Sequence, residues 1–124
     1  MSERIAHMLS KDGRRKIIEV LVSERGEGGA SEALGVSKAA LSKFLRGKTH
    51  PSDVLTARAI EIAEGEEREK IIMIIAEDLA SFARDFAFLV RNYEKKSKGE
   101  ELLRIALKQL EESCGELRKS IEMH

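Results

Sequence analysis

The sequence contains few of the residues that would indicate β-strands, loops rich in proline, or a membrane segment. It has no tryptophan, four phenylalanines, one tyrosine and a single proline among 124 residues. This scarcity, beside abundant Glu, Lys, Leu, Ile and Ala, favours an all-α chain. The longest apolar run covers residues 71–76, far too short for a transmembrane helix. The first nine residues carry charges where a signal peptide needs an apolar stretch. We therefore expect a cytoplasmic protein that does not enter a membrane.

Residues that bind metals or perform catalysis are equally scarce. Cys114 is the only cysteine, so it cannot form an internal disulfide, and we expect an inert, partly buried thiol rather than a reactive one. His7, His50 and His124 lie too far apart in the sequence to show a metal-ligand spacing. No glycine-rich phosphate loop and no nucleophile motif is present. The sequence thus predicts no enzyme, no cofactor, no metal site and no evident small-molecule ligand.

The net charge of zero conceals an uneven distribution. Residues 1–52 contain ten Lys/Arg and six Asp/Glu, a net charge of +4, whereas residues 53–124 contain twelve and sixteen, a net charge of −4. The stretch 33–52 holds four cations and no acid, namely Lys38, Lys43, Arg46 and Lys48. A basic stretch on a neutral chain indicates a surface that meets an anion.

Apolar spacing and glycines divide the first half into short helices. Residues 2–9 form a short helix or an arm, and apolar residues at helical spacing predict helices over 13–25, 29–34, 37–46 and 52–63. Gly26, Gly28 and Gly29 end the second of these pieces, and Gly35, Gly47 and Gly65 end the later ones. This half therefore predicts a compact domain of five helices over residues 1–64.

The second half has longer periodic segments. From residue 66 to residue 93, apolar residues recur at steps that average close to 3.6, which indicates one stripe on a helix about 40 Å long. A turn follows at 94–99, where Ser97 and Glu100 match a capping box that starts another helix. That helix carries its own stripe at Leu103, Leu107, Leu110, Leu117 and Ile121. Residues 65–124 therefore predict a helical hairpin.

The stretch 27–48 matches the geometric requirements of a helix-turn-helix. Two steeply crossing helices need a small residue at their contact, which Ala30 or Ser31 supplies, and a turn residue with positive φ, which Gly35 supplies. Val36 would fill the space between the helices, and Leu41, Phe44 and Leu45 would form the buried stripe. The outward residues would then be Ser37, Lys38, Ala39, Ser42, Lys43 and Arg46. Such a basic and hydroxyl-bearing face fits a major groove.

These residues resemble a known family. The segment from Ala33 to Ser52, with its Leu-Gly-Val-Ser turn and its Arg-Gly-Lys-Thr-His-Pro tail, is similar to the helix-turn-helix of phage-repressor, Cro-like (xenobiotic-response-element) regulators. The resemblance covers about residues 14–64, and it departs from the family at Ala30 and Ser31, where Leu-Ala is usual. It implies a five-helix DNA-binding domain whose second motif helix lies in the major groove. Ser37, Lys38, Ala39, Ser42 and Lys43 would face base edges, and Arg46, Lys48 and Thr49 would hold the backbone.

The sequence therefore predicts a sequence-specific transcriptional regulator that binds double-stranded DNA as a homodimer. Residues 65–124 would form the dimer, because their wide apolar stripe is too large for one neighbouring helix to cover; its interface residues are Ile71, Ile75, Leu79, Phe82, Phe86 and Leu89. The alternative is a protein-interaction or antitoxin-like module whose acidic hairpin binds a partner protein. Arg14, Arg15 and Lys16, at a helix start, fit either phosphate contacts or ordinary surface charge.

Overall fold

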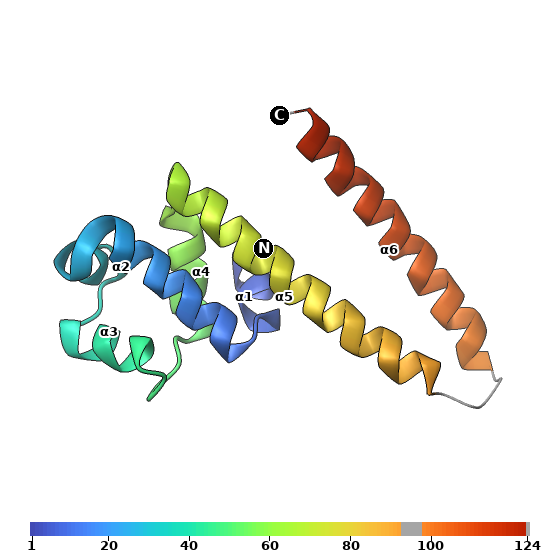
Figure 1. Ribbon diagram of the computed structural model, residues 1–124, viewed down its shortest axis with the longest axis horizontal. Helices are drawn as coiled ribbons and strands as arrows, with labels where there is room; N and C mark the ends of the chain where they lie inside the picture. The colour runs from blue at the N-terminus through green and yellow to red at the C-terminus, as the bar shows by residue number, and fades with distance from the viewer. Residues whose placement is uncertain (93–97, 124) are drawn as a thin grey trace. The chain divides into compact units, whose positions relative to one another are not determined.

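The computed structural model describes residues 1–92 and 98–123, and helices joined by short turns make up this part of the chain (Figure 1). Its helices are α1 (Ser2–Met8), α2 (Lys11–Leu34), α3 (Lys38–Leu45), α4 (Asp53–Ile62), α5 (Glu66–Arg91) and α6 (Lys98–Glu122). The predicted all-α class is confirmed. By its internal contacts the chain divides into two units, Met1–Phe86 and Ala87–His124, so this division falls later in the chain than the predicted one at Gly65.

The helix α2 is interrupted by Gly26, whose φ of 77° and ψ of 167° are not helical. Helical residues 11–25 precede this kink and helical residues 27–34 follow it directly. The predicted end of a helix at Gly26 is confirmed, but the next helical segment starts at Glu27 rather than at residue 29. Gly28 and Gly29 lie inside that segment. Gly28 and Gly29 are therefore part of the helix, and the positive φ of Gly26 alone makes the kink.

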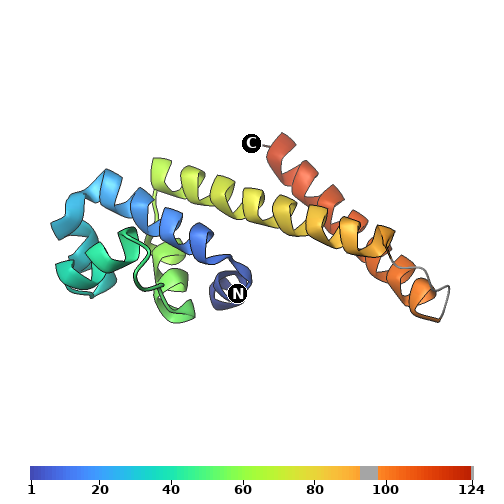
Figure 2. The ribbon, with the colours of Figure 1, turned by 60° about the horizontal axis from the view of Figure 1, so that its bottom comes forward.

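One hydrophobic core holds the unit Met1–Phe86 together. Its centre consists of α2 side chains with no measurable exposure, Ile17, Ile18 and Leu21. Helix α2 contacts α3 and α4, and α1 contacts α4. Figure 1 and Figure 2 both show α3 at the edge of this unit, on the side away from α1. The core also includes Leu41 of α3, Ala59 of α4 and Ala63, which directly follows α4.

Polar side chains fasten the end of α1 to the beginnings of α2 and α4. Arg14 of α2 donates to the Pro51 carbonyl at 2.9 Å and pairs with Asp53, the first residue of α4. His7 of α1 places its Nδ1 2.8 Å from the same carboxylate. These hydrogen bonds, from His7 and then from Arg14, lower the pKa of Asp53. The carboxylate therefore joins α1, α2 and α4 as an ionised group.

The first half of α5 belongs to the same core. Ile71 is 1% exposed and packs with α2 residues, and Ile75 is half-buried against them. Ile71 therefore cannot contact a second chain, and its predicted place in a dimer interface is wrong. Further along α5, Asp78 accepts hydrogen bonds from the Ser10 amide at 2.6 Å and from the Ser10 hydroxyl at 2.9 Å. The start of α2 thus docks on α5 through a carboxylate.

Helix α6, taken by itself, is a long amphipathic helix without a core. None of its described side chains is buried. Cys114 is exposed, which corrects the expectation of a partly buried thiol, because no described side chain of α6 lies in a core. The predicted turn and its capping residue Ser97 fall largely outside the described residues, as does Tyr93. Within 1–92 and 98–123, every helix is too short or too polar to cross a membrane.

Candidate nucleic-acid interface

The turn that leads into α3 is held by specific hydrogen bonds. Gly35 has a φ of 70°, as the sequence predicts, and its amide donates to the Ser31 carbonyl at 2.9 Å. The Ser31 hydroxyl donates to the Val36 carbonyl on the far side of the turn. Arg58 of α4 donates from Nη1 to the Leu34 carbonyl at 2.9 Å. Because Arg58 bonds the last carbonyl of α2, it keeps α3 at a defined position against α4.

Helix α3 begins and ends at residues suited to both positions. At its start, the Ser37 hydroxyl accepts a hydrogen bond from the Ala40 amide at 3.0 Å, which is a typical N-cap. At its end, Gly47 takes a φ of 71°, and its amide donates to the Phe44 carbonyl at 3.0 Å. The Lys48 amide donates to the Lys43 carbonyl at 2.9 Å. Both ends are therefore satisfied within α3 and its flanking residues.

The two faces of α3 differ in the way the sequence predicts. Leu41 is 1% exposed, and Val36, Phe44 and Leu45 pack half-buried against the core. On the other side, Lys38, Ala39, Lys43 and Arg46 are exposed, whereas Ser42 is half-buried beside them. Ser37, Lys48 and Thr49 are exposed at the two ends. The structure thus brings all eight predicted DNA-contacting residues together on one helix and its flanks.

The cations of this surface lack acidic partners. Within residues 1–92 and 98–123, no ion pair involves Lys38, Lys43, Arg46 or Lys48. Among these four side chains, only that of Arg46 has a hydrogen bond within the described residues, from Nε to the Ser42 carbonyl at 3.4 Å. We name the surface formed by these four cations and by Ser37, Ala39, Ser42 and Thr49 the α3 surface. Its positive charge is available to an anion from solution.

The cations at the start of α2 are in the opposite situation. Arg14 pairs with Asp53, Arg15 with Asp12 and Glu19, and Lys16 with Asp12 at 3.2 Å. Hydrogen bonds from Arg15 and then from Lys16 lower the pKa of Asp12. The sequence left two interpretations open for Arg14, Arg15 and Lys16, namely phosphate contacts or ordinary surface charge. Their ion pairs within the protein favour ordinary surface charge.

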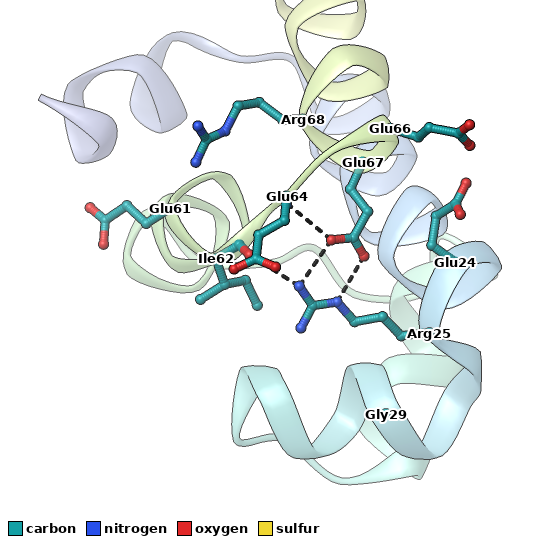
Figure 3. Close-up of a pocket in the computed structure, with 9 residues that line it drawn as sticks. All are labelled: Glu24, Arg25, Gly29, Glu61, Ile62, Glu64, Glu66, Glu67 and Arg68. Carbon is teal, nitrogen blue, oxygen red and sulfur yellow. Dashed lines mark hydrogen bonds and ion pairs between the residues drawn. The ribbon is translucent and has the colours of Figure 1, made fainter.

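A second polar cluster lies at the kink of α2 and had no signal in the sequence. Arg25 donates from Nε and Nη2 to the two carboxylate oxygens of Glu67 at 2.7 and 2.9 Å, and from Nη2 to the Ile62 carbonyl at 3.0 Å (Figure 3). Glu67 is 6% exposed and also accepts from the Glu64 amide at 3.2 Å. The hydrogen bond from Arg25 lowers the pKa of Glu67. This cluster fastens the kink, the end of α4 and the start of α5 together.

The hollow around this cluster is unsuited to nucleic acid. Figure 3 shows Glu24, Glu61, Glu64 and Glu66 around the Arg25–Glu67 pair, with Arg68 as the second cation. Four further carboxylates beside an internally satisfied pair would repel a phosphate. The acidic residues do not form a metal site either, since no group of three or more potential ligands within the described residues could hold an ion. Of these two polar surfaces, the α3 surface is the one whose cations have no acidic partner within the described residues.

Comparison with known proteins adds no further assignment. No family model, no curated protein and no solved structure matches the chain. The functional interpretation rests on the residues and geometry described above.

Proposed function

We propose that the protein is a helix-turn-helix transcriptional regulator that binds double-stranded DNA sequence-specifically as a homodimer. The observation that carries the proposal is a contrast in charge pairing: Arg14, Arg15, Lys16 and Arg25 on α2 pair with acids of the protein, whereas within the described residues the four cations of the α3 surface do not. Leaving four cations unpaired on one small helix and the residues that follow it is unfavourable for the isolated chain. A polyanion in contact with the α3 surface offsets that repulsion.

In this proposal the segment 27–34 is the first helix of the motif and α3 is the recognition helix. Lys38 and Lys43 are the candidates for guanine contacts, because a lysine ammonium can donate to O6 and N7 in the major groove. The Ser37 hydroxyl accepts from the Ala40 amide, and its own O–H can donate to a base or a phosphate. Arg46, Lys48 and Thr49, at and beyond the end of α3, are placed to contact the DNA backbone.

The experiment measures binding of the full chain to a duplex selected from a random library and to an unrelated duplex, at about 50 and 200 mM salt. If two chains together make six to ten phosphate contacts, affinity falls about a thousandfold or more between these salt concentrations. Lys43→Ala should cost about 1–3 kcal/mol on the selected duplex and less on the unrelated one. Lys48→Ala should weaken both duplexes alike and lower the salt slope by about one unit for each phosphate that the lysine no longer neutralises.

The matched control is Lys108→Ala, which removes an exposed lysine from α6. It changes the net charge by the same amount and should leave binding to both duplexes unaltered. Equal losses for Lys43→Ala and Lys108→Ala would show that only overall charge matters. Unchanged binding in Lys38→Ala and Lys43→Ala, with the fold retained, would remove α3 from the interface.

The homodimer part of the proposal is supported by the exposed apolar residues of α5. Leu79, Phe82, Phe86 and Leu89 are between 38% and 66% exposed and follow one another at helical spacing. Phe82→Glu combined with Phe86→Glu should convert a dimer into a monomer near 13.9 kDa. It should weaken binding to a palindromic site much more than to one half-site, because two recognition helices one DNA turn apart must bind together. A wild-type chain that sediments as a monomer at micromolar concentration would contradict the homodimer.

The second candidate function is a protein-interaction or antitoxin-like module. The same exposed apolar residues favour it, on a half of the chain with net charge −4. It predicts that the chain stays monomeric alone and fails to bind duplex DNA at about 50 mM salt, where phosphate contacts are strong.

A further inference from the structure

We propose that the α6 helices of two chains pair in parallel and in register, through a seam formed by Leu103, Leu107, Leu110, Cys114, Leu117 and Ile121. The inference rests on the homodimer part of the proposed function and gives that dimer a segment and an orientation. It does not require that the protein bind DNA.

The first argument is the spacing of the seam. Its residues follow one another at steps of 4, 3, 4, 3 and 4, which is the heptad repeat of 3.5 residues that keeps a narrow stripe on one side of a supercoiled helix. Leu103, Leu110 and Leu117 occupy d positions, and Leu107, Cys114 and Ile121 occupy a positions. Leucine at every d position, with a β-branched residue among the a positions, is typical of parallel two-stranded coiled coils.

The second argument is that α6 needs a partner. Its seam residues Leu107, Leu110, Leu117 and Ile121 are 43% to 71% exposed. An isolated amphipathic helix takes most of its stability from the packing of its apolar face, and Gly115, in the second half of the 25 residues of α6, weakens it further. At about 80 Å² for each of six seam side chains, two α6 helices would bury about 1,000 Å² in total. That is the lower bound for a specific interface, and the exposed residues of α5 can add to it.

The third argument is charge, and it selects the orientation. The e positions that flank the seam are Arg104, Glu111 and Arg118. In an antiparallel pair that overlaps fully, e positions face e positions, so Arg104 would face the partner's Arg118, and Glu111 would face the partner's Glu111. Every one of these contacts joins like charges. In a parallel pair, e positions face g positions, which are the uncharged residues Gly99, Ala106, Ser113 and Ser120.

Cys114 serves as the probe of this geometry. In a parallel pair in register it faces the partner's Cys114 across the axis, within reach of a disulfide. In the fully overlapping antiparallel pair it faces the partner's Leu110, and the two sulfurs lie about four residues apart along the helices. At 1.5 Å per residue this adds about 6 Å to the lateral separation, which is too far for a disulfide without backbone movement.

The experiment oxidises the full chain at micromolar concentration with glutathione disulfide, which accepts the two electrons and two protons of two thiols. We expect a disulfide-linked dimer to form at least tenfold faster than in a control that carries Cys114→Ser with Glu112→Cys, whose thiol lies at an outward f position. Cys114→Ser with Leu103→Cys should cross-link like the wild type, because all seam positions face their own copies. A dimer by light scattering in which neither seam cysteine cross-links faster than the control would overturn the parallel arrangement.

A second pair of variants tests the seam without cysteine chemistry. Leu110→Glu, within the seam, should reduce the mass by light scattering from twice 13.9 kDa to 13.9 kDa. Leu102→Glu changes a leucine that is even more exposed, 68% against 47% for Leu110, and that lies outside the seam; it should leave the dimer intact. Dissociation by Leu102→Glu but not by Leu110→Glu would place the interface on another face of α6. Duplex binding, measured separately, tests the proposed DNA contacts whatever the outcome here.

Discussion

Helices α2 and α6 are almost equally long, at 24 and 25 residues, yet they differ completely in burial. Six residues of α2 are buried, whereas none of the described side chains of α6 is. Both carry leucine and isoleucine, so apolar content alone does not create a core. The difference is that α2 contacts α3 and α4 and shares one core cluster with Ile71 of α5, whereas α6, taken by itself, carries an apolar seam that we propose pairs with a second chain. Helix α2 lies at the centre of a core, and in our proposal α6 forms a dimer contact.

The largest test of this comparison is a leucine truncation in each region. Leu21→Ala removes a fully buried side chain from the centre of the core and should destabilise the unit Met1–Phe86 by about 2–5 kcal/mol. Leu102→Ala in α6 removes a side chain that is 68% exposed and should change stability by less than about 0.5 kcal/mol. Urea unfolding followed by circular dichroism measures both. Similar losses for the two variants would mean that the two helices do not differ in burial as described.

Replacing one glycine in each region by alanine should change stability in opposite directions and by smaller amounts. Gly35 has a left-handed backbone, and a Cβ there would lie 3.4 Å from Arg58 Nη1. Gly35→Ala should therefore cost about 1–2 kcal/mol, and Gly35→Val should cost more and also weaken DNA binding. Gly115 is helical, and a Cβ there would meet nothing within 4 Å, so Gly115→Ala should stabilise α6 by about 0.5–1 kcal/mol.

Thermal unfolding and helical content by circular dichroism separate these two glycine variants. The unfolding temperature should fall in Gly35→Ala and rise or stay constant in Gly115→Ala. An unchanged unfolding temperature in Gly35→Ala would show that the turn before α3 can adopt another conformation. Loss of helicity in Gly115→Ala would show that the glycine lies at an interruption of α6.

The same comparison explains how far the sequence could predict the structure. Periodicity and glycine positions predict local features well: the positive φ of Gly35, the burial of Leu41 and the bounds of α4 to within one residue. They cannot show where a continuous stripe changes partner. Ile71 and Leu79 belong to one stripe on α5, yet Ile71 is buried in the core and Leu79 is 52% exposed. That change depends on where α5 leaves the other helices, which no local pattern encodes.

In the candidate site, too, the local features could be predicted from the sequence and the long-range contacts could not. The exposed residues of α3 follow from its own helical spacing, so the sequence predicts the whole set. The contacts that fix α3 and its surroundings join residues far apart in the chain: Arg58 with the Leu34 carbonyl, and Arg25 with Glu67. A single sequence contains many arginines and glutamates, and only the packing of the helices decides which of them meet. The supporting contacts therefore had to be seen in the structure.

The smallest expected effect concerns the Arg25–Glu67 pair, which joins the kink of α2 to the start of α5. Hydrogen bonds from Arg25 lower the pKa of Glu67 below its ordinary value of 4.5. The ionised carboxylate therefore contributes stability that is fully present above about pH 4.5 in the folded protein, and this contribution is lost as the pH falls through the lower, folded-state pKa. Glu67→Gln should cost about 1 kcal/mol at pH 7, and the difference from the wild type should shrink during acidification below about pH 4.5.

The matched control is Glu69→Gln, which changes an exposed glutamate on the same turn of α5 that makes no ion pair with the described residues. Urea unfolding at several pH values between about 7 and 3 measures both variants. A Glu67→Gln deficit that stays constant over this range would assign the loss to packing of the side chain rather than to its charge, and α5 would then be joined to the kink by shape alone.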